Sequence, residues 1–588
     1  MLRVLMLCVL AWPCMVAGGQ VIYVDASASP GGSGRSWEQA FDSLHAGLAA
    51  AGSGDQVWVA GGVYPTTSDP LDRDATFTVP DGVRVYGGFV GKESKLAERG
   101  DPFDRRAILD GLGVSYTVVT MDDTGPGTTL DGFTILDGVA DGGVAEQTRG
   151  GGIHARGATG ATPNLRNLDI RDCFANLAGS AIYVGSMTAT PITIERVLVT
   201  DNTGDQSAVY VADGSSQLTD VDILGNDVTG LAILSDGFHR IVDCRIEGNT
   251  SPAVSPSFGV ADVGGIYIDM QPGGIGTEIE GSVIRGNSGP RSGGVSYRGV
   301  GQHVLRLSRI LDNEGTTAVS GGGGIAVISS TTQLTLDIEN CLIAGNEIGG
   351  AQGSGVLAQG SPVTVNIFSS TVADNASAGL TGSAVEYGNN GAGGQVINTI
   401  IWGNTNTGGL PRLSDSLDGT NPGPTADRCI LEHFPSNPIS VPFSATDCSG
   451  DDPLFADTAV FDLSASSPAI DAGDNASLPG LVAADILGRV RIRDDAGVPD
   501  SGKGLPGEPI IDLGAAEFQG TTPGGACSAD VNGDGVVSDS DFFAWVTAFI
   551  ADPRTTEQEA ACDVNENGSC SDSDFFAWVT LFVAGGCP

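Results

Sequence analysis

Short alternating segments that each end in an asparagine recur through the middle of the chain. They read VLVTDN, VDILGN, CRIEGN, SVIRGN, SRILDN, CLIAGN, STVADN and TIIWGN, and they end at Asn202, Asn226, Asn249, Asn287, Asn313, Asn346, Asn375 and Asn404. Val or Ile stands three residues before every asparagine, and Val, Cys, Ser or Thr stands five residues before it. Because alternate residues of a strand share one face, these two columns predict strands with a common buried face.

The repeat varies in length but keeps its ending. Successive asparagines are separated by 24, 23, 38, 26, 33, 29 and 29 residues. Such a pattern predicts coils that stack on one another, with insertions confined to the turns. Asparagine tolerates left-handed turn conformations and can hydrogen-bond to a neighbouring side chain. We therefore expect the asparagines to sit in the turns and to form a ladder along the stack.

A second strand is predicted in many coils, where small residues precede an aliphatic residue. These aliphatic residues are Ile153, Ile182, Val209, Ile266, Ile325 and Val385. Tyr183, Tyr210 and Tyr267 each follow one of them and should face outward, either as a stacking ladder or as a platform for sugar rings. Tyr297 and Tyr387 have the opposite parity and should point inward.

The repeat resembles the right-handed parallel β-helix of the pectin-lyase-like superfamily. Its flanks are similar as well: a strand, an amphipathic helix carrying Trp37, Phe41, Leu44 and Leu48, and a strand at Val57 look like the N-terminal cap of secreted β-helices. The stretches SPAIDAGDN from Ser467 and IDLGAAEF from Ile511 are similar to their closing segment. The resemblance implies an all-β solenoid with an N-terminal cap helix.

Two copies of one loop occupy the C-terminal end. DVNGDGVVSDSD begins at Asp530 and DVNENGSCSDSD begins at Asp563, with a glycine at the sixth position of each. Oxygen ligands at this spacing, around a sharp turn, are typical of a Ca²⁺ loop. The predicted ligands are Asp530, Asn532, Asp534, the Val536 carbonyl and Asp541 in the first loop, and Asp563, Asn565, Asn567, the Ser569 carbonyl and Asp574 in the second. The second loop has one carboxylate fewer and should bind more weakly.

Helical spacing follows the first loop, at Phe542, Phe543, Trp545, Val546 and Phe549. The two loop-then-helix halves resemble the dockerin module. Cys527 and the terminal Gly586-Cys587-Pro588 look like the cysteine-bearing variant found in planctomycete surface proteins. This resemblance implies Ca²⁺ as cofactor and a cohesin-like or other cell-envelope receptor as the partner of residues 524–588.

The net charge limits the partners that the protein can bind, and the N-terminal segment predicts that it is secreted. The formal net charge is −43, which excludes nucleic-acid binding by repulsion. Arg3 followed by an apolar run and by small residues up to Gly19 predicts a secretory signal, and no later stretch is apolar for long enough to span a membrane. Among the cysteines, Cys429 and Cys448 could form a disulfide in an oxidising compartment.

These observations predict five regions. They are a signal peptide (1–19), an N-terminal cap with the first coils (20–105), parallel β-helix repeats (106–450), a closing segment (451–520) and a dockerin-like calcium module (521–588).

The sequence offers few candidate catalytic residues. Its three lysines, Lys92, Lys95 and Lys503, lie outside the coils, and its five histidines are isolated. Paired carboxylates occur at Asp122-Asp123, Asp451-Asp452 and Asp494-Asp495, and Arg285 and Arg309 could face an acidic sugar or act as surface charges. The sequence favours a non-catalytic surface protein. The alternatives are a docked polysaccharide lyase or glycoside hydrolase, and an adhesin that binds polysaccharide along the β-helix through Tyr183 and Tyr210.

Overall fold

The computed structural model describes residues 19–519, apart from 158–161, 186–190, 252–258, 318–320, 330–332, 351, 380–382, 389–391, 408–423, 433–443, 479–482, 494, 496 and 506–507. The chain divides into two compact units, residues 1–450 and 451–588. The predicted signal up to residue 18 and the calcium module at 521–588 lie outside the described residues.

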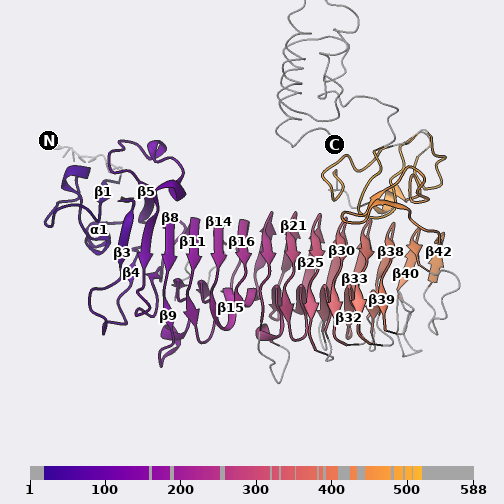
Figure 1. Ribbon diagram of the computed structural model, residues 1–588, viewed down its shortest axis with the longest axis horizontal. Coiled ribbons are helices and arrows are strands. Elements are labelled where there is room, and N and C mark those ends of the chain that lie inside the picture. Colours follow the sequence, from indigo (N-terminus) through magenta and orange to yellow (C-terminus); the bar gives the residue numbers. More distant parts are fainter. Residues whose placement is uncertain are drawn as a thin grey trace, which may run out of the picture. The chain divides into compact units, whose positions relative to one another are not determined.

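The first unit is a stack of parallel strands, drawn side by side from indigo to orange in Figure 1. Its largest sheet, which we call the first sheet, joins 24 strands within the described residues. These are β1 (Val21–Val24), β2 (Gln56–Ala60), β3 (Gly62–Pro65), β5 (Arg84–Phe89), β6 (Ala107–Asp110), β8 (Thr129–Leu136), β11 (Asn164–Arg171), β14 (Ile192–Thr200), β16 (Ser216–Leu224), β18 (Phe238–Val242), β19 (Arg245–Glu247), β21 (Gly276–Glu280), β22 (Val283–Arg285), β25 (Gly301–Arg306), β26 (Arg309–Leu311), β29 (Leu334–Glu339), β30 (Leu342–Ala344), β33 (Val363–Phe368), β34 (Thr371–Ala373), β37 (Gln395–Ile397), β38 (Ile400–Trp402), β40 (Thr425–Asp427), β41 (Ile430–Leu431) and β42 (Ser444–Thr446).

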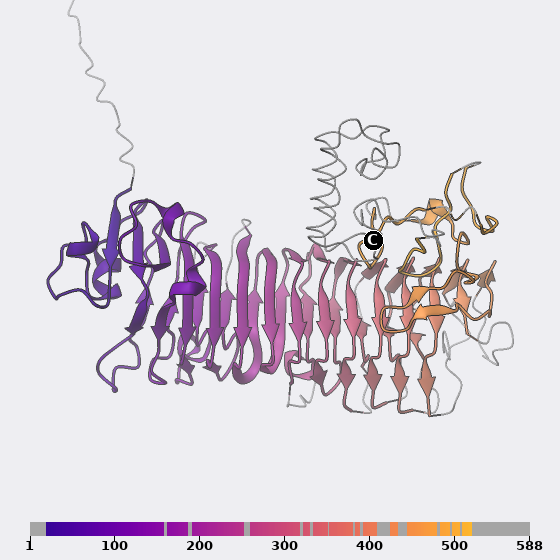
Figure 2. The ribbon, with the colours of Figure 1, turned by 45° about the horizontal axis from the view of Figure 1, so that its top comes forward.

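A second sheet contains the strands predicted after the turns, and Ile153, Ile182, Val209, Ile266, Ile325 and Val385 all lie in it. Its described strands are β4 (Phe77–Thr78), β7 (Val119–Thr120), β9 (Val139–Ala140), β10 (Ile153–Arg156), β12 (Phe174–Ala175), β13 (Ile182–Gly185), β15 (Thr203–Ala212), β17 (Asp227–Ser235), β20 (Ile266–Met270), β24 (Val295–Gly299), β28 (Ile325–Ile328), β32 (Val356–Gln359) and β36 (Val385–Tyr387). A third, short sheet joins β23 (Ser288–Gly289), β27 (Glu314–Gly315), β31 (Glu347–Ile348), β35 (Ala376–Ser377) and β39 (Thr405–Asn406). Figure 2 shows that successive coils follow the colour order along the stack.

The core of the stack is the space enclosed by these sheets. The column three residues before each asparagine is buried throughout, from Val199 to Ile401, and so is the column five residues before it, from Val197 to Thr399. Both columns run in register, as β14 and β16 do at Val197 beside Val221 and Val199 beside Ile223. The predicted inward face is confirmed.

The asparagines form the predicted ladder, but they do not make the left-handed turn. Each amide nitrogen donates to the side-chain oxygen of the next asparagine over 2.8 to 3.0 Å, from Asn202 to Asn404. The positive φ belongs to the residue before each asparagine, always Asp or Gly, as at Asp312 (53°) and Gly345 (67°). Because this preceding residue makes the turn, the asparagine side chain is free to point inward and bond along the stack.

Each coil also contains a second left-handed residue that the sequence pattern does not reveal. It lies six residues before the asparagine, for example at Asp243 (φ 53°), Leu307 (49°) and Ser369 (48°). The chain bends there, so the segment expected as one strand is divided in the later coils, as into β18 and β19. The bend places the small residue that follows inside the coil.

The N-terminal helix is shorter than predicted. The α-helix α1 spans Leu44–Ala50, while Trp37 lies in a 3-10 turn, η1 (Trp37–Gln39). Phe41 pairs with Val24 in a β-bridge, and its backbone N–H donates to the carbonyl of Tyr23 over 2.9 Å. Strand pairing thus holds Phe41 outside the helix, whereas Leu44 and Leu48 are buried as expected.

The second unit contains few regular elements in its described part. An antiparallel pair, β43 (Phe455–Asp457) and β44 (Asp462–Leu463), is followed by a 3-10 turn, η6 (Asn475–Ser477). Loops make up most of the remainder. None of the helices in the part of the chain that the structure describes has the length and apolar character needed to cross a membrane.

Candidate functional site

An open cleft of about 220 Å³ lies on the outer face of the first sheet. Asp169 of β11, Leu198 of β14 and Asp222 of β16 line it as register partners in three consecutive strands. Arg196 and Asp220 also line it, and both are the left-handed residues of their coils, with φ of 53° and 54°. Asp169, Leu198 and Asp222 are therefore positions that the repeat itself turns outward.

Two side chains from the segment just before β6 also line the cleft. Phe103 belongs to the 3-10 turn η3 (Pro102–Arg105), and Arg106 follows it directly. Arg106 Nη1 is 2.5 Å from Asp169 Oδ2 and 3.4 Å from Thr134 Oγ1. An aromatic ring, an arginine and carboxylates thus meet in one small cleft.

Asp169 is the residue in this cleft with unused hydrogen-bonding capacity. It is only 4% exposed, and its second oxygen, Oδ1, is buried without a hydrogen-bond partner among the described residues. A buried acceptor without a donor costs free energy. A ligand hydroxyl or an ordered water that donated to Oδ1 would remove that cost. Asp169 could not be predicted from the sequence, because it matches no motif and meets Arg106 only through the fold.

Farther along the same face, charged side chains pair from coil to coil. Arg240 Nη2 is 2.8 Å from Glu280 Oε2, and Arg306 Nη2 is 3.2 Å from Glu278 Oε1. Arg285, a candidate for binding an acidic sugar, pairs instead with Asp312 at 2.9 Å, and both side chains are more than half exposed. These contacts support the interpretation of Arg285 as a surface charge.

The paired carboxylates serve local structure. Asp122 Oδ1 accepts from the backbone N–H of Arg156 and lies 2.9 Å from His154 Nδ1. Asp452 Oδ1 accepts from Leu454 N–H, and Asp495 Oδ1 accepts from Gly497 N–H. Asp494 lies outside the described residues.

The tyrosines of the second sheet are covered rather than exposed. Tyr183 stacks on Tyr210 with ring centroids 5.7 Å apart, while Tyr183 and Tyr267 are 6% and 3% exposed. The turn η5 (Val260–Asp262) supplies an apolar cover, because Val260 packs in one cluster with Tyr267 and Tyr210. Stacking is confirmed for Tyr183 and Tyr210. The expectation of exposed rings is wrong for Tyr183 and Tyr267, which are both buried. Tyr297 and Tyr387 point inward, as expected.

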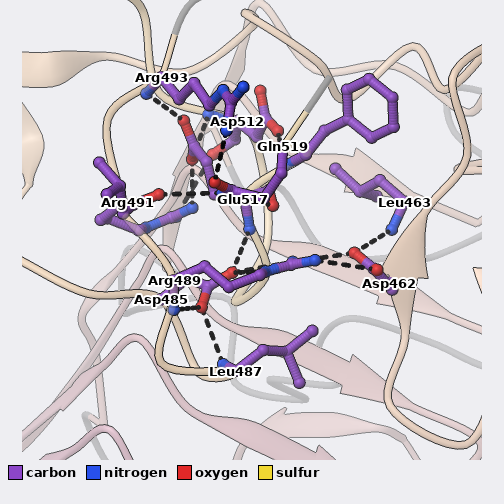
Figure 3. A network of polar contacts seen from close by, with 12 residues as sticks. Asp462, Leu463, Asp485, Leu487, Arg489, Arg491, Arg493, Asp512, Glu517 and Gln519 are labelled. Atoms are coloured by element: carbon purple, nitrogen blue, oxygen red, sulfur yellow. Dashed lines mark hydrogen bonds and ion pairs between the residues drawn. The ribbon is translucent and has the colours of Figure 1, made fainter. Parts of the chain in front are cut away.

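The second unit encloses a network of charged groups (Figure 3). Arg491 and Glu517 are fully buried and form an ion pair of 2.7 Å. Arg489 binds Asp462 through Nη1 and Nη2, and it contacts Asp485 Oδ2 through Nε and Nη2, all at 2.9 Å. The backbone N–H of Glu517 donates to Asp485 Oδ2 and joins the two halves.

Asp512 belongs to the same network, although no cationic side chain contacts its carboxylate directly. Burial raises the pKa of Asp512 to about 7, while the backbone N–H groups of Phe518 and Asp471 oppose that shift. Burial also raises the pKa of Glu517, and Arg491 opposes that shift. Since the described part of this unit has little regular secondary structure, these buried polar contacts hold its loops together.

The calcium ligands predicted at Asp530 to Asp574 lie outside the described residues. Within the described residues, no group of three or more His, Cys, Asp or Glu side chains is arranged to hold a metal ion.

Comparison with known proteins confirms both family resemblances. Residues 151–399 match the model of the right-handed β-helix region, and residues 528–577, which contain both predicted calcium loops, match the model of the dockerin type I domain. No curated protein sequence matches the chain.

Several solved structures are similar to this chain at low identity. Pectate lyase Pel9A is 13% identical over 86% of this chain and 98% of its own, with a TM-score of 0.37. A rhamnogalacturonan lyase is 14% identical over 70% and 87%, with a TM-score of 0.29. The A-module of Azotobacter vinelandii mannuronan C-5 epimerase AlgE4 is 12% identical over 68% and 99%, with a TM-score of 0.31.

Proposed function

We propose that this protein, a right-handed β-helix region joined to a C-terminal dockerin type I domain, is a secreted, non-catalytic surface component attached through its calcium module. The observation that carries the proposal is the match of residues 528–577 to the dockerin type I domain, which contains all ten predicted oxygen ligands. A docking module gives the chain a means of attachment that needs no membrane span.

Calcium supplies the cross-link that holds each loop closed when it is bound. Asp530, Asn532, Asp534, Asp541 and the Val536 carbonyl would hold one ion. Asp563, Asn565, Asn567, Asp574 and the Ser569 carbonyl would hold the second. All of these ligands are hard oxygen donors, which suit Ca²⁺.

The partner we propose is a cohesin-like or other cell-envelope receptor that binds residues 524–588. Positions 10 and 11 of the two loops are identical, Asp539-Ser540 and Asp572-Ser573, and such symmetry would allow the module to bind in two orientations. The coil stack would then be the exposed part of the complex. Its coil-to-coil ion pairs, such as Arg240 with Glu280, support a structural role for the outer face.

Affinity capture tests the attachment. The full-length chain is incubated with the host's envelope fraction in Ca²⁺ or in chelator, beside the Asp530→Ala/Asp534→Ala variant. We expect one receptor to be retained by the wild type in Ca²⁺ only. Retention that is equal in chelator and in the variant would contradict calcium-dependent docking.

The cleft around Asp169 favours a second candidate function, the binding or cleavage of polysaccharide. Asp169 and Asp222 are two strand spacings apart in the register, so their backbones lie on the order of 9.5 Å apart. Two carboxylates on one face at such a spacing are the groups that inverting glycosidases use. Phe103 and Arg106 could contact a sugar ring and its acidic groups.

An assay on uronic-acid and neutral polysaccharides separates the two functions. The primary proposal predicts neither new reducing ends nor unsaturated products. Turnover that disappears in Asp169→Asn but persists in Arg285→Gln would establish the enzyme instead, since Arg285 lies in a different coil and pairs with Asp312.

A further inference from the structure

Cys429 and Cys448 occupy the same position in two successive coils. The strands before them, β40 and β42, pair in register at Asp427 beside Thr446. After them Ile430 and Ser449 form a parallel bridge, and Ser449 N–H donates to the carbonyl of Cys429 over 2.9 Å. Backbone pairing on both sides therefore fixes the two cysteines next to each other.

The two side chains are in direct contact. Cys429 is buried in the coil interior, and the half-buried Cys448 packs against the same core and interacts with the Cys429 thiol. This contact lowers the pKa of the Cys448 thiol, whereas burial raises that of Cys429. Cys448 is thus the more accessible thiol and the better nucleophile.

Cys429 and Cys448 differ from the residues that hold the same interior position in the earlier coils. The same interior position is held in earlier coils by Cys244, Ser282, Ser308, Cys341, Ser370 and Thr399. There, a hydroxyl accepts the backbone N–H of the preceding coil, as Ser370 Oγ does from Cys341 over 3.0 Å. Cys341 has Ser308 and Ser370 as neighbours, so no second thiol lies beside it in the column.

We propose that Cys429 and Cys448 form a disulfide that fastens the last described coil to the stack. Adjacent strands lie about 4.7–4.9 Å apart, which falls inside the window of about 4.4–6.8 Å between the Cα atoms of a disulfide. A cell exterior or periplasm is an oxidising compartment in which such a bond persists.

The bond forms by thiol–disulfide exchange. The Cys448 thiolate attacks a protein or small-molecule disulfide, and one thiol of that oxidant leaves. The Cys429 thiol then loses its proton and displaces the second. One sulfur–sulfur bond has formed in the chain, one has broken in the oxidant, and the oxidant carries away two electrons and two protons as two thiols.

The position gives the bond a structural purpose. Within the described residues, β42 pairs only with β40, so it is the edge of the first sheet. An edge strand of three residues, Ser444–Thr446, has few backbone contacts that oppose its opening. A covalent link at Cys448 holds that edge closed.

Peptide mapping of the full-length secreted protein tests the bond directly. Free thiols are alkylated during unfolding and before proteolysis, so that buried thiols also react, and the wild type is compared with Cys429→Ser, Cys448→Ser and the matched control Cys341→Ser. We expect a linked peptide pair containing residues 429 and 448 in the wild type and in Cys341→Ser. The two other variants should lack it, with the remaining partner alkylated after unfolding.

Limited proteolysis gives the second measurement. Cleavage near residues 444–449 should be slower by at least about tenfold in the oxidised wild type than in Cys448→Ser. A native disulfide typically shifts the unfolding equilibrium toward the folded state by more than about tenfold. Reduction should remove the difference. The proposal is overturned if both thiols are alkylated after incubation with oxidised glutathione, or if Cys448 is linked to another cysteine instead.

Discussion

Asn287 and Asn313 are joined by two hydrogen bonds to one oxygen. Asn287 donates from its side-chain amide to Asn313 Oδ1 over 3.0 Å, and its backbone N–H reaches the same oxygen at 3.1 Å. The Asn313 amide in turn donates to Asn346 Oδ1 and to the carbonyl of Ile284, both at 2.9 Å. One buried side chain therefore satisfies polar groups of the coil before it and of the coil after it.

Replacing Asn313 by alanine should destabilise the coil stack by about 2–4 kcal/mol, because buried donors on Asn287 would lose their acceptor. The free energy of unfolding is measured in denaturant. The adjacent variant Asp312→Gly is the control, since it removes only an exposed ion pair and glycine holds the same turn position at residues 286 and 345. Equal costs for the two variants would contradict a buried ladder.

Ile310→Asp should cost more than Asn313→Ala, at least about 4 kcal/mol, because it places a carboxylate in the fully buried column. Val283→Asp offers a matched control on the outward face of the neighbouring coil, where Val283 is partly exposed beside Arg309. We expect that variant to change the denaturation midpoint little. A similar loss in both would show that the inward and outward faces are wrongly assigned.

Gly286 tests the left-handed turn by itself. Its φ is 60°, and a Cβ added there would meet no atom within 4 Å, so a substitution carries only the conformational cost. Gly286→Val should cost about 1–2 kcal/mol, whereas Gly286→Asp should cost clearly less, since aspartate takes this conformation at Asp201, Asp312 and Asp374. Thermal unfolding of the two variants, side by side, decides the matter: equal midpoints would be inconsistent with this account.

Stability of the second unit should fall as the pH rises from about 4 to about 7. Folding raises the pKa of Asp512 from its ordinary value of 3.8 to about 7, so the folded unit holds a proton that the unfolded chain has released over this range. The expected change over this range is on the order of 1–3 kcal/mol.

Hydrogen exchange of peptides from residues 485–517, corrected for intrinsic rates, measures this pH dependence. Asp512→Asn should remove most of the slope whatever it does to the absolute stability. Protection that increases with pH in the wild type would contradict the shift.

Calcium binding should depend more on the first loop than on the second. Calorimetric titration of the full chain should show a greater loss of affinity in Asp530→Ala/Asp534→Ala than in Asn565→Ala/Asn567→Ala, because the first pair removes two negative charges. The titrations are run on oxidised and reduced protein, since disulfides among Cys527, Cys562, Cys570 and Cys587 would hold the module folded without metal. No binding in either state would remove the metal assignment.

The sequence was sufficient for the parts of the fold that repeat. The columns ending in Asn313 and Asn346 predicted the strands, their inward face and the ladder, because a stack imposes the same environment on every coil. The sequence did not show which residue makes the left-handed turn. Asparagine and the Asp or Gly before it are both common turn residues, and only the backbone of the structure shows which of them has positive φ. The bend at Leu307 carried no signal, since leucine rarely takes that conformation.

The cleft around Asp169 could not be predicted from the sequence, for a different reason. Arg106 and Asp169 are far apart in sequence and lie in regions with no shared motif, so their contact depends on how the segment just before β6 meets the coils. The sequence supplied the tyrosine stack but not its cover, because η5 lies in an insertion of irregular length. Residues within the repeat were predictable, whereas contacts made by insertions were not.

The asparagine ladder has a direction. Each amide donates one hydrogen to the side-chain oxygen of the asparagine in the later coil, and its nitrogen also donates to a carbonyl of the earlier coil, as Asn313 does to Ile284. The bonds between asparagines therefore all run in the same sense from Asn202 to Asn404. Removing or adding an entire coil in the middle would leave every rung complete, while cutting at either end would strand a donor or an acceptor. The length of the stack can thus change during evolution in units of one coil, whereas its two ends must each be specified separately.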